Sequence, residues 1–179
     1  MTSSTERSGS GVSRELVSEY LSYEPQTGIL RWRKSTYRRG RPGDIAGAIR
    51  AGHRTVNLLG RRYVATHLIW LLMTGEWPPN QIEHRNNDGT DDRWDNLRPA
   101  TQTQNTYNNS IRRDNTSGYK GVHPYRRGNS SRWVAQIGKQ HLGYFNAAEE
   151  AARAYDEAAA EAYGEFAFLN FHRRVQVKG

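Results

Sequence analysis

The sequence predicts an α+β fold in two successive small units, and three observations support this prediction. Only 35% of the 179 residues are hydrophobic, which is low for one large core and favours two small ones. Residues 102–118 are polar throughout, so they divide the chain; their first part can form a helix and their second part a linker. After them, three strand-like runs precede an alanine-rich helical pattern, which is typical of a small sheet packed on one helix.

The composition limits the kinds of protein that this chain can be. Lysine and arginine total 26 against 18 acidic residues, giving a net charge of +8. Such an excess favours a polyanionic partner, most commonly nucleic acid, over a basic protein without one. The absence of cysteine excludes disulfides and thiolate metal sites. Because no apolar run reaches membrane-spanning length and the N-terminus lacks a signal-peptide core, we expect a soluble, intracellular protein with no membrane contact.

The first unit is expected to follow a disordered tail at residues 1–12, which are rich in serine, threonine and glycine. A short helix is predicted from Ser13, because apolar residues follow it at helical spacing and its side chain can cap the first turn. A turn at residues 25–28 contains proline and glycine, and it leads into a short strand at 29–33.

A hairpin and a buried helix are predicted next. Residues 53–59 and 63–66 have strand-like composition on either side of Gly60, which predicts a hairpin around that glycine. Residues 67–73 are apolar but too few to cross a membrane, so they predict a buried helix. That helix is expected to end near Gly75, because two prolines follow shortly after.

Residues 31–62 form the most basic stretch of the chain, with ten basic side chains and one acid, Asp44. We interpret this stretch as a surface that neutralises nucleic-acid phosphates, because its charge is so one-sided. The alternative is an ordinary solvated loop face.

The second unit is expected to be a three-stranded antiparallel sheet covered by one helix. The predicted strands are residues 119–125, 132–137 and 140–145. The helix should run from about residue 147 to 163, with Asn146 as its cap, Glu149 completing a capping-box pattern, and Gly164 ending it. Its apolar stripe is narrow and rich in alanine, so the helix can lie close against the sheet.

A candidate catalytic set lies in the last part of the first unit. Glu83 and His84 are adjacent, Asn96 follows twelve positions after His84, and Asn105 nine positions after Asn96, with a loop-forming stretch in between. A neutral imidazole is a suitable general base near neutral pH, because its reference pKa is about 6.5. Carboxylate and amide oxygens suit Mg²⁺, which can stabilise the charge that develops on a phosphate during hydrolysis. A strand, a loop, a strand and a helix would bring these residues to one cleft.

Residues 13–109 resemble the HNH (His-Asn-His) homing-type endonucleases that are common in phages and have a ββα-metal site. The resemblance depends on the order and spacing of several motifs: Tyr-Glu-Pro-Gln-Thr-Gly-Ile-Leu-Arg-Trp (23–32), Ala-Thr-His-Leu-Ile-Trp (65–70), Gly-Glu-Trp-Pro (75–78), Ile-Glu-His-Arg-Asn-Asn-Asp-Gly (82–89), Asp-Asn-Leu-Arg-Pro-Ala-Thr (95–101) and Gln-Asn (104–105). The implied activity is metal-dependent hydrolysis of DNA that leaves 5′-phosphate and 3′-hydroxyl ends.

This resemblance implies a role for each residue of the set. His84 is the general base, Glu83 and Asn105 ligate one Mg²⁺ (or Mn²⁺), and Asn96 holds the loop so that the base is aimed correctly. The chain departs from the usual pattern in that Glu83 stands where aspartate is common. The extra methylene must bend to reach the same metal, and it keeps open the alternative of an inactive nuclease half.

The other histidines of the first unit are assigned lesser roles. His67 heads the apolar helix, and we favour packing or hydrogen bonding beneath the site over contact with a phosphate. His53 is assigned no role, and neither is His172 near the C-terminus.

Residues 116–171 resemble the plant Apetala/ethylene-response-factor (ERF) DNA-binding domain. The matching motifs are Tyr-Lys-Gly-Val (119–122), Trp-Val-Ala-Gln-Ile (133–137), Leu-Gly-Tyr-Phe (142–145), Ala-Ala-Glu-Glu-Ala-Ala-Arg-Ala-Tyr-Asp-Glu-Ala-Ala (147–159) and Leu-Asn-Phe (169–171). The resemblance implies a three-stranded sheet that enters the major groove of double-stranded DNA. The charge distribution agrees with DNA binding by the sheet. Residues 112–139, which include the first two predicted strands, hold seven basic residues and one acid, whereas residues 149–165, mostly in the predicted helix, hold six acids and one base.

Strand alternation separates the two faces of the predicted sheet. Trp133, Ala135 and Ile137 should face the helix, and the alternate residues Arg132, Val134 and Gln136 should point outward. The family's contact positions, with two arginines of the adjacent turn, give these DNA-contact residues: Lys120, His123, Tyr125, Arg126, Arg127, Arg132, Gln136, Lys139, His141 and Tyr144. Several differ from the plant pattern, so the plant target sequence is not expected.

The sequence therefore predicts a metal-dependent DNA endonuclease with a sequence-reading C-terminal domain. The alternatives are a sequence-specific, transcription-factor-like DNA-binding protein with an inactive nuclease half and, third, a binder of structured RNA. The expected organisation is a tail, a nuclease domain, a linker, an ERF-type domain and a basic tail: 1–12, 13–109, 110–118, 116–171 and 172–179. We expect it in the cytoplasm of a bacterial or phage-infected cell; the sequence leaves the oligomeric state open, with a monomer favoured.

Overall fold

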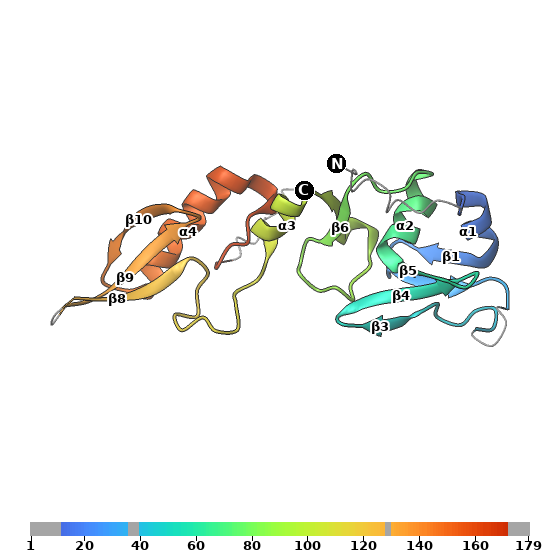
Figure 1. Ribbon diagram of the computed structural model, residues 1–179, viewed down its shortest axis with the longest axis horizontal. Coiled ribbons are helices and arrows are strands. Elements are labelled where there is room, and N and C mark those ends of the chain that lie inside the picture. The colour runs from blue at the N-terminus through green and yellow to red at the C-terminus, as the bar shows by residue number, and fades with distance from the viewer. Residues whose placement is uncertain (1–11, 36–39, 128–129, 172–179) are drawn as a thin grey trace, which may run out of the picture. The chain divides into compact units, whose positions relative to one another are not determined.

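The computed structural model describes residues 12–35, 40–127 and 130–171. The basic tail at 172–179 and all but the last residue of the N-terminal tail lie outside these ranges. The chain forms two compact units, Met1–Gln102 and Thr103–Gly179, which we describe separately (Figure 1). Within the described residues, no helix is long and apolar enough to cross a bilayer.

The first unit starts with the predicted helix and with a hairpin, of which the sequence predicted the turn and the second strand but not the first strand. Helix α1 (Arg14–Tyr20) is capped by Ser13, whose Oγ accepts a hydrogen bond of 3.3 Å from the Leu16 backbone N–H. Strands β1 (Leu21–Glu24) and β2 (Ile29–Trp32) pair antiparallel.

A three-stranded antiparallel sheet and a helix form the middle of the first unit. Its strands are β3 (Ala48–Arg50), β4 (His53–Leu58) and β5 (Arg61–Val64), in the order β3-β4-β5. The predicted hairpin around Gly60 is therefore confirmed. Helix α2 (Ala65–Thr74) begins two residues before its predicted start and ends at Gly75, whose φ of 87° is left-handed.

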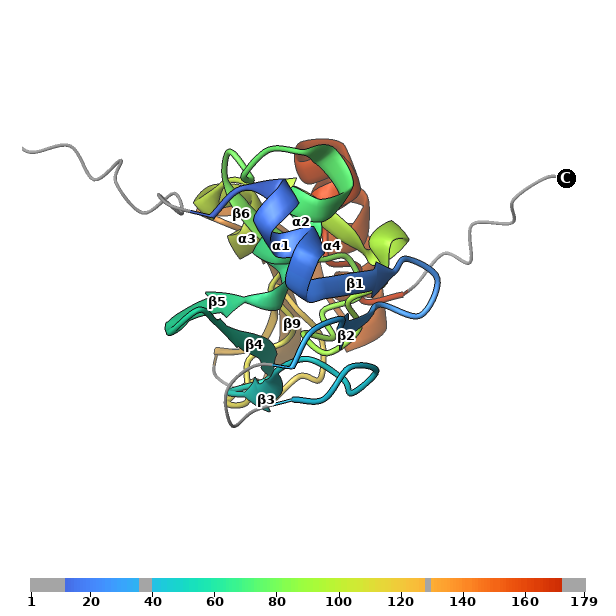
Figure 2. The same cartoon turned by 90° about the vertical axis from the view of Figure 1, so that its right-hand side faces the viewer.

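The apolar core of the first unit lies between α1, α2 and one face of this sheet. Figures 1 and 2 both show α1 and α2 next to each other on the same side of the β4–β5 hairpin. The core is built from side chains that are fully or almost fully buried, among them Val17, Leu30, Val56, Leu58, Leu68 and Ile69.

The last sheet of the first unit holds part of the predicted catalytic motif. Strand β6 (Gln81–His84) pairs antiparallel with β7 (Leu97–Ala100), and the short 3₁₀ helix η1 (Trp94–Asn96) precedes β7. Helix α3 (Gln102–Asn108) follows at the border of the two units. The observed fold is mixed α and β with small antiparallel sheets, which agrees in outline with the predicted class.

The second unit is a three-stranded antiparallel sheet with a helix on one face. Its strands β8 (Val122–Arg127), β9 (Ser130–Ile137) and β10 (Gln140–Phe145) lie in the order β10-β9-β8, and α4 (Ala148–Tyr163) packs against all three. The 3₁₀ helix η2 (Gly164–Phe166) follows. Two small clusters join sheet to helix, one at Val122, Ala135, Ala151 and Ala152, the other at Ile137, Tyr155 and Ala159.

Two predicted boundaries of the second unit are wrong. Helix α4 is capped at Ala147 rather than Asn146, and the Ala147 N–H donates to Glu150 Oε2 at 3.4 Å, so Glu150 takes the place predicted for Glu149. Strand β8 starts three residues later than predicted, because Ser117 Oγ donates to the Tyr119 carbonyl at 3.0 Å and holds a turn there.

Candidate active site and candidate nucleic-acid interface

The β6–β7 hairpin carries an unusual concentration of buried polar side chains. Glu83 and His84 end β6 and are 5% and 7% exposed. In the antiparallel register, Glu83 lies opposite Arg98, which is also buried. Buried charges are costly unless they are paired, so the partners of these groups define the site.

Glu83 is held by Arg98 through one of its two carboxylate oxygens. Arg98 Nε donates to Glu83 Oε1 at 2.5 Å. The second oxygen, Glu83 Oε2, is buried and has no hydrogen-bond partner among the described residues. A buried carboxylate oxygen without a partner is costly, and it is the kind of hard oxygen donor that Mg²⁺ binds. Glu83 therefore fits a metal ligand, although it would share its charge with a guanidinium.

The second predicted metal ligand, Asn105, lies on α3 and belongs to the second unit. The residues predicted to bind metal thus supply one carboxylate and one amide from separate units. No cluster of three or more histidine or acidic side chains able to hold a metal occurs in the described part of the chain.

His84 makes a buried contact with an acidic residue that the sequence analysis did not identify. His84 Nε2 lies 2.9 Å from Asp92 Oδ1, and Asp92 is 2% exposed. An ionised carboxylate can only accept, so this hydrogen bond assigns the imidazole proton to Nε2 and the lone pair to Nδ1. Asp92 thereby fixes the orientation of the ring.

Asp92 is itself held by two residues from distant parts of the first unit. The Tyr23 hydroxyl donates to the Asp92 carbonyl at 2.8 Å, and Arg54 Nε lies 3.8 Å from Asp92 Oδ2. Burial and the nearby acidic residues, Asp92 first among them, raise the pKa of Tyr23 above its usual range, so the tyrosine stays a donor. Only the fold unites these residues, because Tyr23 and Asp92 are 69 positions apart.

Asn96 closes the loop that joins β6 to η1. Its Nδ2 donates to Asn86 Oδ1 at 2.9 Å and to the Asp91 carbonyl at 2.7 Å, and its Oδ1 accepts from the Asn86 N–H at 3.0 Å. The same loop is held at Asp91 by Arg93, whose side chain lowers the pKa of Asp91 to about 2. This geometry matches the loop-holding role that the resemblance implies for Asn96.

His53, to which the sequence analysis assigned no role, lies against the candidate base. The two imidazole rings stack with their centroids 5.9 Å apart. The loop at Gly89 also comes close to His53. Glycine is required at position 89, because a Cβ there would lie 2.3 Å from the Gly52 carbonyl oxygen and 2.7 Å from His53 Nδ1. His67, by contrast, lies on α2, where burial lowers its pKa.

The outer face of the second unit gathers six of the predicted DNA-contact residues. In the antiparallel registers, Arg132 lies opposite Tyr125, and Gln136 opposite His141. Opposed residues project from the same side of a sheet, and α4 covers the other side. The six residues are His123, Tyr125, Arg132, Gln136, His141 and Tyr144, which we call the outer sheet face.

Aromatic contacts organise the outer sheet face. The Tyr144 ring is 4.8 Å from that of Tyr125 and 4.7 Å from that of His141, and Tyr144 remains 49% exposed. Val134, predicted to point outward, lies opposite His123 and Tyr144 but is only 4% exposed. The predicted exposure of Val134 is therefore wrong, because the larger residues on both neighbouring strands cover it.

Of the other predicted contact residues, Arg127 alternates with His123 and Tyr125 and projects from the same side of the sheet as they do, whereas Arg126, Lys139 and Lys120 lie elsewhere in the second unit. Arg126 and Arg127 are exposed and belong to strand β8 rather than to the adjacent turn, and Lys139 is exposed just before β10. Lys120 Nζ donates to the carbonyls of Tyr107 at 2.7 Å and Asn109 at 2.6 Å, and burial lowers its pKa to about 8.

Comparison with known proteins identifies both segments. Residues 63–107 match the model of a family described as HNH endonuclease. Similar curated proteins include an ethylene-responsive transcription factor of Arabidopsis thaliana (39% identical, covering 38% of this chain and 18% of the relative), another of Lotus japonicus (43%, covering 37% and 26%), and a dehydration-responsive element-binding protein of Oryza sativa subsp. japonica (48%, covering 29% and 17%).

These matches are partial. The chain covers about a quarter or less of the length of these curated relatives, and no solved structure matches it. The two kinds of match are nevertheless those that the sequence motifs predicted. The chain therefore combines a segment that matches the HNH endonuclease family model with a similarity to plant ERF-type transcription factors.

Proposed function

We propose that this protein is a divalent-metal-dependent DNA endonuclease whose second unit reads the sequence of double-stranded DNA. The observation that carries the proposal is the buried contact of His84 with Asp92, within a loop clamped by Asn96. An imidazole oriented by a carboxylate is a common arrangement for a general base. Its location inside the HNH endonuclease segment makes a phosphodiester the substrate that fits best.

Each residue of the site has a defined part in the proposed reaction. His84 accepts the proton of the attacking water, and its contact with Asp92 through Nε2 orients the ring for this step. Glu83 would hold the metal, with Asn105 as the second protein ligand that the resemblance implies. Bound there, Mg²⁺ or Mn²⁺ would stabilise negative charge on the phosphate and on the leaving oxygen. Asn96 keeps the loop closed, so that the Asp92 carboxylate stays against the ring.

A DNA-binding protein with an inactive nuclease half is the second candidate. Two observations favour an inactive nuclease half. Arg98 already neutralises Glu83, and the His84 side chain is only 5% exposed. A phage-type homing role, and a location in the cytoplasm of a bacterial or phage-infected cell, remain predictions from the sequence.

The test is cleavage of plasmid DNA with Mg²⁺, Mn²⁺ or a chelator, comparing the native protein with His84→Ala and Asp92→Asn. General-base catalysis contributes about 10²–10⁴-fold, so we expect His84→Ala to lose activity on that order. Added imidazole should restore part of that activity. Asp92→Asn keeps the shape of the carboxylate but not its charge, and we expect an intermediate loss.

The two candidates give different outcomes in this assay. No cleavage of any DNA by the native protein with either metal would support the DNA-binding protein. Equal cleavage by the native protein and by His84→Ala, with both folded by circular dichroism, would assign the base to another residue.

A further inference from the structure

The sheet β3-β4-β5 of the first unit has one face in the core and one that is not. Val56 and Leu58 are fully buried on the core face. Alternate residues of β4 must project from the opposite face, and the register places Asn57 opposite Arg62 and Arg50 opposite His53 on that face. This outer face is therefore polar and basic.

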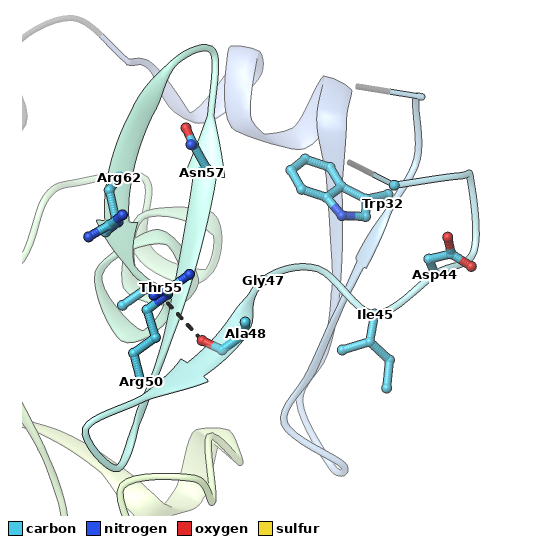
Figure 3. A pocket seen from close by; sticks show the side chains of 10 residues that line it. Trp32, Asp44, Ile45, Gly47, Ala48, Arg50, Thr55, Asn57 and Arg62 are labelled. Atoms are coloured by element: carbon cyan, nitrogen blue, oxygen red, sulfur yellow. Dashed lines mark hydrogen bonds between the residues drawn. The ribbon is translucent and has the colours of Figure 1, made fainter. Parts of the chain in front are cut away.

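A hollow of about 360 Å³ lies on this outer face. Figure 3 shows Arg50, Thr55, Asn57 and Arg62 along one side of it, with Trp32 and Ile45 across from them. We call the first four residues the basic groove. The Thr55 hydroxyl donates to the Ala48 carbonyl at 3.5 Å, whereas Asn57 and the two arginines offer hydrogen-bond donors of the kinds that contact nucleic-acid phosphates.

The two arginines of the basic groove have no acidic partner in the part of the chain that the structure describes. Within the described ranges, neither Arg50 nor Arg62 makes an ion pair, and both are exposed. The one acid of the stretch, Asp44, also lines the hollow, but its Oδ2 accepts from the Arg41 backbone N–H at 2.9 Å. Unpaired arginines in a stretch with ten basic residues and one acid complement a polyanion.

The basic groove is continuous with the candidate active site through strand β4. This strand begins at His53, which stacks on His84, and the next residue, Arg54, approaches Asp92. His53 and Asn57 project from the same face, and four strand residues span about 13 Å. B-DNA advances about 3.4 Å per base pair, so the Asn57 end of the groove lies roughly four base pairs from a phosphate held at His84, whereas Arg50, opposite His53, lies next to it.

We propose that the basic groove is a second DNA-binding surface, which grips the phosphate backbone of the duplex from next to the scissile phosphate to about four base pairs away. Arg50 and Arg62 neutralise phosphates, while Asn57 donates hydrogen bonds. The distance to the cut rests on the proposed function of His84, whereas binding to the groove does not. Contacts of this kind position the duplex without reading its sequence.

The test measures binding by the full-length protein, in chelator, to a duplex of random sequence across a series of salt concentrations. Each lost phosphate contact should reduce the slope of log affinity against log salt by about 0.9. We expect the double variant Arg50→Gln/Arg62→Gln to lower that slope by about 1.8. The matched control is Arg61→Gln, the adjacent arginine on the opposite face of β5, which should leave the slope nearly unchanged.

The location of the groove's phosphate contacts relative to the cut is tested separately. The method is phosphate ethylation interference on a substrate whose cleavage site has been mapped. Interference that extends from the cut to about four base pairs away and disappears in the double variant supports the proposal. An unchanged salt slope in the double variant overturns it, and so does an equal change in Arg61→Gln. A structured RNA that binds more tightly than the duplex, with the same loss in the double variant, also overturns it. If the double variant lowers the salt slope as expected but the native protein cuts no DNA, the proposed catalysis is wrong, whereas DNA binding by the basic groove is supported.

Discussion

The two units place their candidate functional residues in opposite environments. In the first unit, Glu83, His84, Asp92 and Arg98 are all buried and contact one another in pairs. In the second unit, the outer sheet face is mostly exposed, and one of its two tyrosines, Tyr144, is half accessible. The first unit keeps its candidate catalytic residues away from bulk water, whereas the second unit exposes its candidate DNA-contact residues.

This difference follows from what each task requires. Acid–base chemistry needs groups that are held in one orientation, away from competing water, where electrostatic interactions are strong. Reading DNA needs donors and acceptors that can reach base edges in a groove. We therefore expect substitutions at the first site to change folding as well as activity, and substitutions on the outer sheet face to change binding alone.

The largest expected effect is on the buried ion pair of the first unit. Arg98→Met leaves the Glu83 carboxylate buried without its partner, and breaking a buried pair in this way costs about 3–5 kcal/mol. Chemical unfolding, with hydrogen exchange of peptides from β6 and β7 to localise the effect, measures this loss. The double variant Glu83→Leu/Arg98→Met should recover most of the stability, because no unpaired charge remains. Loss of stability below about 1 kcal/mol in the single variant would show that the pair is open to water.

A smaller effect, confined to binding, is expected on the outer sheet face. Arg132→Ala should weaken binding to a selected target duplex by about 1–3 kcal/mol, while unfolding changes by no more than about 0.5 kcal/mol. Binding to random duplex should change much less, so the ratio of specific to non-specific affinity is the quantity to measure. Arg113→Ala, an exposed arginine outside the sheet, is the matched control. An equal loss for both duplexes would make Arg132 a phosphate contact rather than a base contact.

The elements that depend on local sequence were predictable. Ser13 caps α1, Gly75 ends α2, and Gly60 lies in the turn of a hairpin, because capping and turn formation depend on a few neighbouring residues. The cap of α4 was misplaced by one residue, since Asn146 and Glu149 have the right chemistry at positions that the helix does not use.

The candidate site was predictable only in part. Motif spacing identified His84 and Asn96, but it could not identify Asp92, Arg98 or His53 as their neighbours. Those contacts depend on strand register and on the approach of the loop at Gly89, which bring distant residues together. Similarly, alternation placed Val134 on the correct face, but its burial depends on the residues of β8 and β10.

The smallest expected effect concerns Lys120, an exception to the exposed chemistry of the second unit. Its ammonium donates to two carbonyls, and burial lowers its pKa from 10.5 to about 8. Between pH 8 and 10.5 the unfolded chain therefore binds more protons at this lysine than the folded chain does. Stability of the second unit should rise with pH in that window, by less than a fully buried lysine would give, because solvent screens a half-buried group.

Thermal unfolding of the native protein and of Lys120→Met from pH 7.5 to 9.5 measures this contribution as a difference. Taking this difference removes the contribution of the tyrosines, which is the same in both proteins. That contribution has the opposite sign at higher pH: burial raises the pKa of Tyr155 to about 12, so the folded state keeps a proton that the unfolded state loses. Lys139→Met, at an exposed lysine in the turn before β10, is the control and should follow the native curve. If the native protein instead loses stability relative to Lys120→Met as the pH rises, the two carbonyls hold the charged ammonium more strongly than burial disfavours it, and Lys120 is a structural cation of the second unit.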